Sequence, residues 1–139
     1  MKRCFLLLST LLLASCNQTS IILITNDYDD VEHIKWEETF SIEEKEYLVY
    51  FYSTSCGHCR ELKDEIINYY FLNFEEMRFA CVDEYALYGP TSDISGVNNI
   101  NDFYIFGTPF MIRVYDSTLV NYYAGVGKIR EYIDSKIQK

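Results

Sequence analysis

Residues 47–60 read YLVYFYSTSCGHCR. The first six are apolar or aromatic, and their length and composition favour a strand buried in the middle of a sheet. Residues 53–55 break this pattern with small hydroxyl side chains that can cap a helix. Leu62 and Ile66 then recur at the spacing of one helical face. The stretch therefore predicts a buried strand, a turn and a helix, with two cysteines at the junction.

The position of Cys56 and Cys59 gives them different expected roles. A helix N-terminus has unpaired N–H groups and a positive dipole end, which stabilise an anion, and the thiolate is the reactive form of cysteine. Cys56 lies in the first turn and is the expected nucleophile. Cys59 lies one turn deeper, on the face of Leu62, so we expect it to point to the core and to resolve a mixed disulfide.

A bare C-x-x-C pattern also fits half of a zinc site. Zinc needs about four ligands, and the other candidates after the N-terminal segment are Cys81, His33 and His58, with no second pair. Covalent haem attachment needs a histidine directly after the second cysteine, where this chain has Arg60. We therefore expect neither a metal nor another cofactor.

The rest of the chain predicts alternating strands and helices. Residues 32–46 read as a short helix or an irregular lead-in. Further strands are predicted at 77–82, 110–115 and 119–124, a helix within 92–104, and a last helix along Ile129, Tyr132, Ile133 and Ile137. The order β-α-β-α-β-β-α predicts an α/β domain with a mixed four-stranded sheet flanked by helices.

A second signal is Thr108-Pro109, directly before a predicted strand. Proline cannot donate to a sheet ladder, so it belongs at a strand's start. A cis bond there would form a tight, fixed corner. Taken alone, the pattern fits an ordinary trans proline better.

With these motifs the chain resembles the thioredoxin superfamily from residue 47 to residue 139. Residues 47–60 are similar to its active-site strand and turn, and Cys-Gly-His-Cys matches protein disulfide isomerases. Thr108-Pro109 matches its cis-proline position, and Gly125 matches the glycine before its last helix. The resemblance implies a thioredoxin-like fold in which Pro109 faces the cysteines. It also implies that the Thr108 backbone pairs with an extended substrate segment.

The chain departs from that family's pattern in three places. Ser55 replaces the usual tryptophan before the first cysteine. Tyr50 replaces the buried acid, which in the family helps proton transfer from the resolving thiol. The segment 84–107 is longer than in thioredoxin itself.

Gly57 and His58, between the cysteines, are supporting candidates. Glycine lets a backbone approach closely, and His58 places a potential cation beside the thiolate. Stabilising the thiolate stabilises the reduced protein, which makes the disulfide a stronger oxidant. We therefore expect a more oxidising pair than that of thioredoxin.

The N-terminus has the organisation of a signal peptide, with basic Lys2 and Arg3 before a short apolar run. Residues 13–16 read LASC and resemble the lipobox of bacterial lipoproteins, which implies cleavage after residue 15 and acylation of Cys16. We expect a signal peptide at 1–15, an acidic tether at 16–31 and the domain at 32–139. An uncleaved anchor and an ordinary secreted protein are the alternatives.

The net charge of the chain limits the classes of partner that it can bind. Acids outnumber bases 21 to 12, for a net charge of −9, which argues against a phosphate-binding surface and hence against nucleic acid as a partner. The expected partners are exported proteins with thiols or disulfides, the membrane through lipidated Cys16, and an unidentified redox partner.

Three further residues have expected structural roles. Cys81 is expected to be a buried structural residue, His33 to be solvated, and Trp36 to pack the lead-in against the domain.

These features predict a thiol–disulfide oxidoreductase lipid-anchored outside the cytoplasm of a bacterium and acting as an oxidase or isomerase. One alternative is a reductase that a membrane donor keeps reduced. Another is a surface lipoprotein that binds a partner and keeps the cysteine pair as a structural disulfide.

Overall fold

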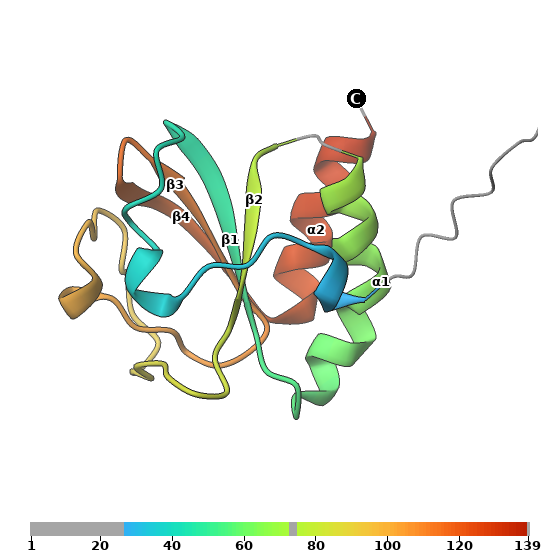
Figure 1. Cartoon of the computed structure of the whole chain (residues 1–139), viewed down its shortest axis with the longest axis horizontal. Coiled ribbons are helices and arrows are strands. Elements are labelled where there is room, and N and C mark those ends of the chain that lie inside the picture. The colour runs from blue at the N-terminus through green and yellow to red at the C-terminus, as the bar shows by residue number, and fades with distance from the viewer. Residues whose placement is uncertain (1–26, 73–74, 139) are drawn as a thin grey trace, which may run out of the picture.

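The computed structural model describes residues 27–72 and 75–138, and it arranges them around one four-stranded sheet (Figure 1). The strands are β1 (Glu46–Tyr52), β2 (Met77–Cys81), β3 (Phe110–Tyr115) and β4 (Thr118–Ala124), and the helices are α1 (Gly57–Phe71) and α2 (Gly125–Ile137). The 3₁₀ helices are η1 (Tyr28–Asp30), η2 (Trp36–Glu38) and η3 (Ile100–Asp102). The predicted signal peptide and Cys16 lie outside the described residues.

The sheet is mixed, with the order β2-β1-β3-β4. β1 pairs in parallel with β2 and antiparallel with β3, which pairs antiparallel with β4. This arrangement confirms the predicted fold class, and all four predicted strands form. The β3–β4 hairpin turns through Asp116 and Ser117, whose φ angles of 52° and 59° match a two-residue turn that follows the twist of the strands.

Strand β1 is buried on both faces because it lies inside the sheet and has a core on each side. Leu48, Tyr50 and Tyr52 face the core under α1 and α2, which lie side by side on one face of the sheet (Figure 1). The alternate residues, among them Val49 and Phe51, face a second core. Residues two apart on a strand share a face, so this short strand anchors both cores.

The helix predicted within 92–104 is wrong. This part of the chain forms only the single turn η3, and an isolated bridge joins Tyr88 to Ile105. Gly96 has a φ of +88°, and the Asn99 side chain accepts the N–H of Asn101, so local turns satisfy the backbone. The segment still buries Phe103 completely. Its apolar side chains cover the second face of the sheet without a helical repeat.

The lead-in before β1 contains the short 3₁₀ helix η2 and is otherwise irregular, in line with the prediction of a short helix or an irregular lead-in, and it is packed. Trp36 stacks on Phe103 with ring centroids 5.0 Å apart, which confirms its role in packing the lead-in against the domain. The packing begins before residue 32, where the sequence placed the domain start. Val31 is buried and Tyr28 packs against the core under the helices. The described end of the expected tether is therefore part of the domain.

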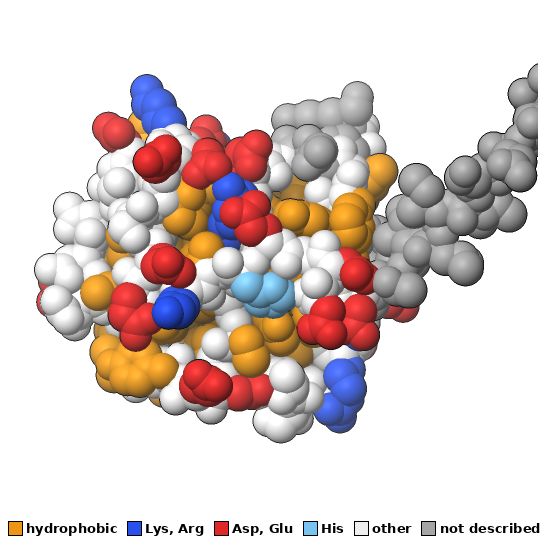
Figure 2. All heavy atoms as spheres, in the orientation of Figure 1, with side chains coloured by type: hydrophobic (Ala, Val, Ile, Leu, Met, Phe, Trp, Pro, Cys, Tyr) orange, Lys and Arg blue, Asp and Glu red, His pale blue; other side chains and the backbone are white. Residues whose placement is uncertain are grey.

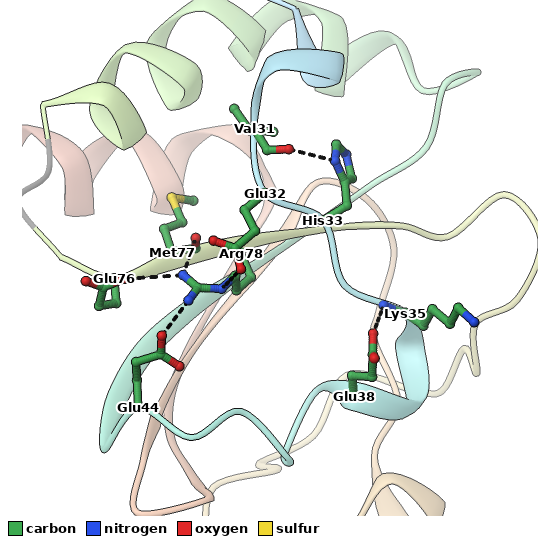
Figure 3. Close-up of polar contacts among 9 residues, drawn as sticks. All are labelled: Val31, Glu32, His33, Lys35, Glu38, Glu44, Glu76, Met77 and Arg78. Atoms are coloured by element: carbon green, nitrogen blue, oxygen red, sulfur yellow. Dashed lines mark hydrogen bonds and ion pairs between the residues drawn. The ribbon is translucent and has the colours of Figure 1, made fainter.

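A charged cluster holds the lead-in to the outer edge of β2 (Figure 3). The guanidinium of Arg78, only 9% exposed, pairs with Glu32 at 2.9 Å, Glu44 at 2.6 Å and Glu76 at 3.3 Å. Phe79 donates its N–H to the Glu32 carbonyl, and its own carbonyl accepts from Ile34. A nearly buried cation needs such partners, and these contacts cover the edge of the sheet.

Acidic side chains are spread over the face shown in Figure 2, with Lys and Arg interspersed among them. In the described part of the chain, no helix is both long enough and apolar enough to cross a membrane.

Candidate functional site

Cys56 lies at the point where β1 gives way to α1, and it is itself the N-cap of the helix. Its sulfur accepts the backbone N–H of Cys59 at 3.1 Å. Capping by residues 53–55 was the expectation from sequence, but here the thiol takes that place. A sulfur that accepts an N–H at the positive end of a helix is stabilised as an anion.

Asp83, just after β2, holds the turn before Cys56. Its carboxylate accepts the N–H of Thr54 at 3.0 Å and also the Thr54 hydroxyl. Hydrogen bonds from Ser53 and Thr54 lower the pKa of Asp83 to about 2. Sequence reasoning missed this residue, although an acid that ends a strand beside the Cys-bearing strand was a usable signal.

The loop before β3 forms the other wall of the site. The Thr108-Pro109 peptide bond is cis, as the family resemblance implied. The Cys56 thiol donates to the Thr108 carbonyl at 3.3 Å, across 52 residues of sequence. Gly125, at a φ of +80°, donates its N–H to the Pro109 carbonyl at 3.0 Å and so ties this loop to the start of α2.

The two thiols differ in burial. Cys56 is partly exposed, and Cys59 is 0% exposed. Partial burial works against ionisation of Cys56, but hydrogen bonds from the Cys59 thiol and from the Cys59 backbone N–H hold the pKa of Cys56 below the usual value for a thiol. Burial, and then the hydrogen bond with Cys56, raise the pKa of Cys59. The thiolate of this pair therefore forms on Cys56 first.

A family model described as Thioredoxin matches residues 28–108, more than half of the chain. The chain belongs to the thioredoxin family. The coarse activity that follows is that of a thiol–disulfide oxidoreductase, with Cys56 and Cys59 as the only close pair of cysteines in the described residues. The match begins at Tyr28, the residue at which packing against the domain begins.

Solved structures with the same fold include thioredoxin f2 of Chlamydomonas reinhardtii, which is 14% identical, with a TM-score of 0.56 over 78% of this chain and 94% of its own. Oxidised mitochondrial thioredoxin 3 of Saccharomyces cerevisiae is 13% identical, with a TM-score of 0.51 over 78% and 97%. A structure from a study of thiol resolution in yeast mitochondrial 1-Cys peroxiredoxin via glutathione and thioredoxin systems is 14% identical, with a TM-score of 0.55 over 78% and 97%. A comparison with curated proteins finds no match.

Tyr50, which stands in this thioredoxin-family domain where the resemblance implied a buried acid, has a second tyrosine beside it. Tyr50 is completely buried, and its hydroxyl lies 3.5 Å from that of Tyr28. The Tyr28 hydroxyl donates to the Cys59 carbonyl at 3.2 Å. Tyr50 was singled out from sequence, but Tyr28 was not, because it lies in a segment that reads as an acidic tether.

The two residues between the cysteines contact little else in the described chain. The His58 side chain is 77% exposed, and its Nδ1 lies 3.5 Å from the Glu61 carboxylate. A Cβ on Gly57 would meet nothing nearer than an Arg60 side-chain nitrogen at 3.8 Å. No other backbone of the described chain therefore approaches Gly57 closely. The His58 imidazole faces the Glu61 carboxylate.

Two other expectations change. Cys81 is exposed, so its predicted burial is wrong, because it is the last residue of β2 and follows the four buried positions of that strand. His33 is exposed, as expected, but its ring nitrogens lie 3.0 Å from the Val31 carbonyl and 2.8 Å from the Tyr52 hydroxyl. Among the described residues, no three His, Cys, Asp or Glu side chains are grouped to hold a metal ion.

Proposed function

We propose that this protein is a lipid-anchored, extracytoplasmic thiol–disulfide oxidoreductase that oxidises or isomerises the disulfides of exported proteins. The observation that carries the proposal is the inequality of its two thiols. Cys56 is partly exposed and has a lowered pKa, whereas Cys59 is buried and has a raised one. An accessible, stable thiolate makes Cys56 both the sulfur that substrates reach and a good leaving group.

In the oxidising direction the cycle starts from a Cys56–Cys59 disulfide. A substrate thiolate attacks the Cys56 sulfur, and Cys59 leaves and takes up a proton. A second substrate thiolate then attacks the substrate sulfur of this mixed disulfide, and Cys56 leaves as a thiolate. The substrate loses two electrons and gains a disulfide, and the pair is reduced to a dithiol. A redox partner of the disulfide class must accept these two electrons to restore the pair.

The surroundings of Cys59 favour a long-lived mixed disulfide. Cys59 must be deprotonated to attack Cys56 and release a substrate, but its raised pKa keeps it a thiol at neutral pH. In residues 27–72 and 75–138, the buried polar or charged side chains are Thr39 and Arg78, and none is a carboxylate that could take the proton. When attack of Cys59 on the mixed disulfide is slow, a second substrate thiol has time to attack that disulfide instead. This supports oxidation and isomerisation.

The reductase direction remains a second candidate because of Glu61. Its carboxylate, 3.5 Å from the His58 imidazole, offsets a cation there and reduces the help that His58 gives to the Cys56 thiolate. The reduction potential separates the two directions. Equilibration with glutathione should give a value above about −230 mV for an oxidase or isomerase, against about −270 mV for thioredoxin and about −180 mV for protein disulfide isomerase.

Turnover assays provide the decisive test of the activity. We expect the oxidised protein to restore disulfides in a reduced, unfolded substrate faster than it catalyses insulin reduction with dithiothreitol. The opposite ranking, with a potential near the thioredoxin value, would assign the reductase direction. Failure in both assays would leave the third hypothesis, a binding lipoprotein with a structural disulfide.

Anchoring rests on the sequence before the described domain. Tyr28 lies twelve positions after Cys16 in the sequence, and an extended chain of that length spans at most about 43 Å. Because Tyr28 contacts α1, an acyl group on Cys16 would keep the cysteine pair near the membrane and within reach of a membrane redox partner. Cys16→Ala should move the protein from the membrane fraction to the soluble fraction and abolish labelling by radioactive palmitate. A wild-type protein that carries no lipid contradicts the anchor.

Thr108 and Pro109 are the proposed substrate-binding residues. The Thr108 carbonyl lies 3.3 Å from the Cys56 sulfur. A substrate that lies extended along this loop would bring its own sulfur to Cys56 while it pairs with the Thr108 backbone. Backbone pairing reads chain shape rather than sequence, which suits an enzyme that acts on many exported proteins.

A further inference from the structure

We propose that Tyr28 is a positioning residue of the redox centre, which holds the first turn of α1 at Cys59 and shields the Cys59 thiol from water. This inference rests on the Cys56–Cys59 pair being the redox centre, but not on the membrane anchor or the direction of electron flow.

The first support is the contact itself. Tyr28 begins η1, 31 residues before Cys59 in the chain, and its hydroxyl donates to the Cys59 carbonyl at 3.2 Å. It also lies 3.5 Å from the hydroxyl of buried Tyr50. The N-terminal segment thereby places a hydrogen-bond donor directly on the backbone of the resolving cysteine.

The second support is how firmly this ring is held. It stacks on Tyr52 with centroids 3.8 Å apart and an angle of 19° between the planes. Lys63, four residues after Cys59 on α1, lies over the Tyr28 ring at 5.5 Å from its centroid. The same ammonium pairs with Asp27 at 3.2 Å, and Asp27 caps η1 by accepting the Tyr28 N–H at 2.7 Å. Stacking, a cation–π contact and an ion pair all fix one side chain.

The third support is burial. Cys59 is 0% exposed and shares a core cluster with Tyr50 and Tyr52, against which the partly buried Tyr28 ring packs. Removal of this ring would open the cluster on the side away from substrate. Water admitted there would solvate the Cys59 thiolate and reduce the desolvation that now opposes its formation.

Tyr28 does not replace the family's acid as a proton acceptor. Burial raises the pKa of Tyr28 to about 12 and that of Tyr50 further still. Both hydroxyls stay protonated at neutral pH and act only as donors or as neutral neighbours. Among the described tyrosines, Tyr28, Tyr50 and, from the long segment before β3, Tyr88 interact electrostatically with both cysteines.

The test is the alkylation rate of Cys59 in the reduced full chain, measured by iodoacetamide labelling and peptide mass spectrometry between pH 7 and pH 11. Only the thiolate reacts, so the rate reports both access and ionisation. We expect Tyr28→Ala to raise the rate at pH 8 about tenfold, because a decrease of one pH unit in the apparent pKa of Cys59 raises the thiolate fraction tenfold. Tyr28→Phe keeps the ring and should raise it about threefold through loss of the hydrogen bond.

Tyr52→Phe is the matched control. It removes a hydroxyl from the same ring stack, but that hydroxyl contacts His33 rather than Cys59. Its Cys59 rate and pH profile should stay within about twofold of the wild type, and labelling of exposed Cys81 should not change in the two Tyr28 variants. Equal effects of Tyr28→Phe and Tyr52→Phe would overturn the inference, as would a wild-type Cys59 profile in Tyr28→Ala.

The comparison remains informative if Tyr28→Ala fails to fold, because the two phenylalanine variants keep their rings. The proposed function fails separately: it fails if the wild-type pair forms no reversible disulfide with glutathione, whatever the alkylation rates are.

Discussion

The cysteine pair has two unlike sides. On the substrate side, Cys56 meets backbone groups: the N–H of Cys59 and the carbonyl of Thr108. On the core side, Cys59 is enclosed by rings, with Tyr50 and Tyr28 behind it. On the substrate side the N–H groups at the start of α1 stabilise an anion, and the core side excludes water. Two identical side chains three residues apart thus acquire opposite acid–base behaviour from their surroundings.

The largest expected effect comes from the substrate side. Cys56→Ser should lower disulfide exchange at least about 1,000-fold, because the alternative thiol is buried and protonated at neutral pH. Insulin reduction and oxidative refolding measure the loss. Cys81→Ser is the control and should match the wild type, since Cys81 is exposed at the end of β2, outside the pair. If Cys56→Ser keeps its activity, the two thiols do not have the different roles assigned to them.

Removal of the core-side thiol should act differently. Cys59→Ala leaves the Cys56 nucleophile in place but removes the group that resolves the mixed disulfide. We expect exported proteins to accumulate as disulfide-linked adducts on Cys56, visible on non-reducing gels, while catalytic insulin reduction falls about 100-fold.

The adducts should disappear in Cys56→Ser/Cys59→Ala. If they persist there, a cysteine outside the pair captures the substrates, and the assignment of Cys56 as nucleophile is wrong.

The pH dependence of the free energy of unfolding should report the opposite pKa shifts of Cys56 and Cys59. The pKa of Cys56 is lowered in the folded protein, so its contribution is present above the unfolded-state thiol pKa of about 8.5 and is lost as pH falls through the folded value. The pKa of Cys59 is raised, so its contribution is present below about 8.5 and is lost as pH rises through the folded value.

Urea unfolding of the reduced protein from pH 6 to pH 10 checks this expectation. Above pH 8.5, the free energy of unfolding of the wild type should decrease relative to that of Cys59→Ala. As pH rises toward 8.5, the free energy of unfolding of the wild type should increase because of Cys56, and Cys56→Ser should lack this increase. Parallel profiles for all three proteins would show that the thiols titrate alike.

The smallest expected effect concerns the turn that carries Cys56. Asp83→Asn weakens the hydrogen bonds to Thr54 and should lower the free energy of unfolding by about 1 kcal/mol, because the carboxylate is exposed and screened by solvent. Its pKa is lowered to about 2, so the difference should vanish as pH falls from about 4 to 2. A difference that persists at pH 2 would assign the effect to packing instead.

Much of the fold could be predicted because its elements are locally encoded. The six apolar residues of β1, the Leu62–Ile66 repeat of α1 and the Phe110–Tyr115 run each match the structure. The segment 84–107 could not be predicted in this way. It buries Ile94, Phe103 and Ile105 at irregular intervals, and only the surface of the sheet beneath it determines which of its residues are inside.

The residues of the candidate site also fall into two groups: those that a local motif predicts and those that only contacts with distant segments identify. Cys56, Cys59 and Pro109 were recognisable because short motifs and a helix start place them. Cys81 was assigned to the core because a strand residue is usually buried, but it lies where the strand ends. Tyr28 and Asp83 had no motif, and their importance comes from contacts across 31 and 29 residues of chain.

The order of residues determined that a buried strand would deliver two cysteines to the start of a helix, since hydrophobic pattern and helix capping act over a few neighbouring positions. The tertiary structure decided how the two thiols differ. Tyr28 and Tyr50 belong to the packing that buries Cys59, and the Tyr28 hydroxyl donates to the Cys59 carbonyl. The carbonyl beside Cys56 comes from Thr108. Desolvation and dipole orientation depend on which distant segments meet, and no local pattern contains that information.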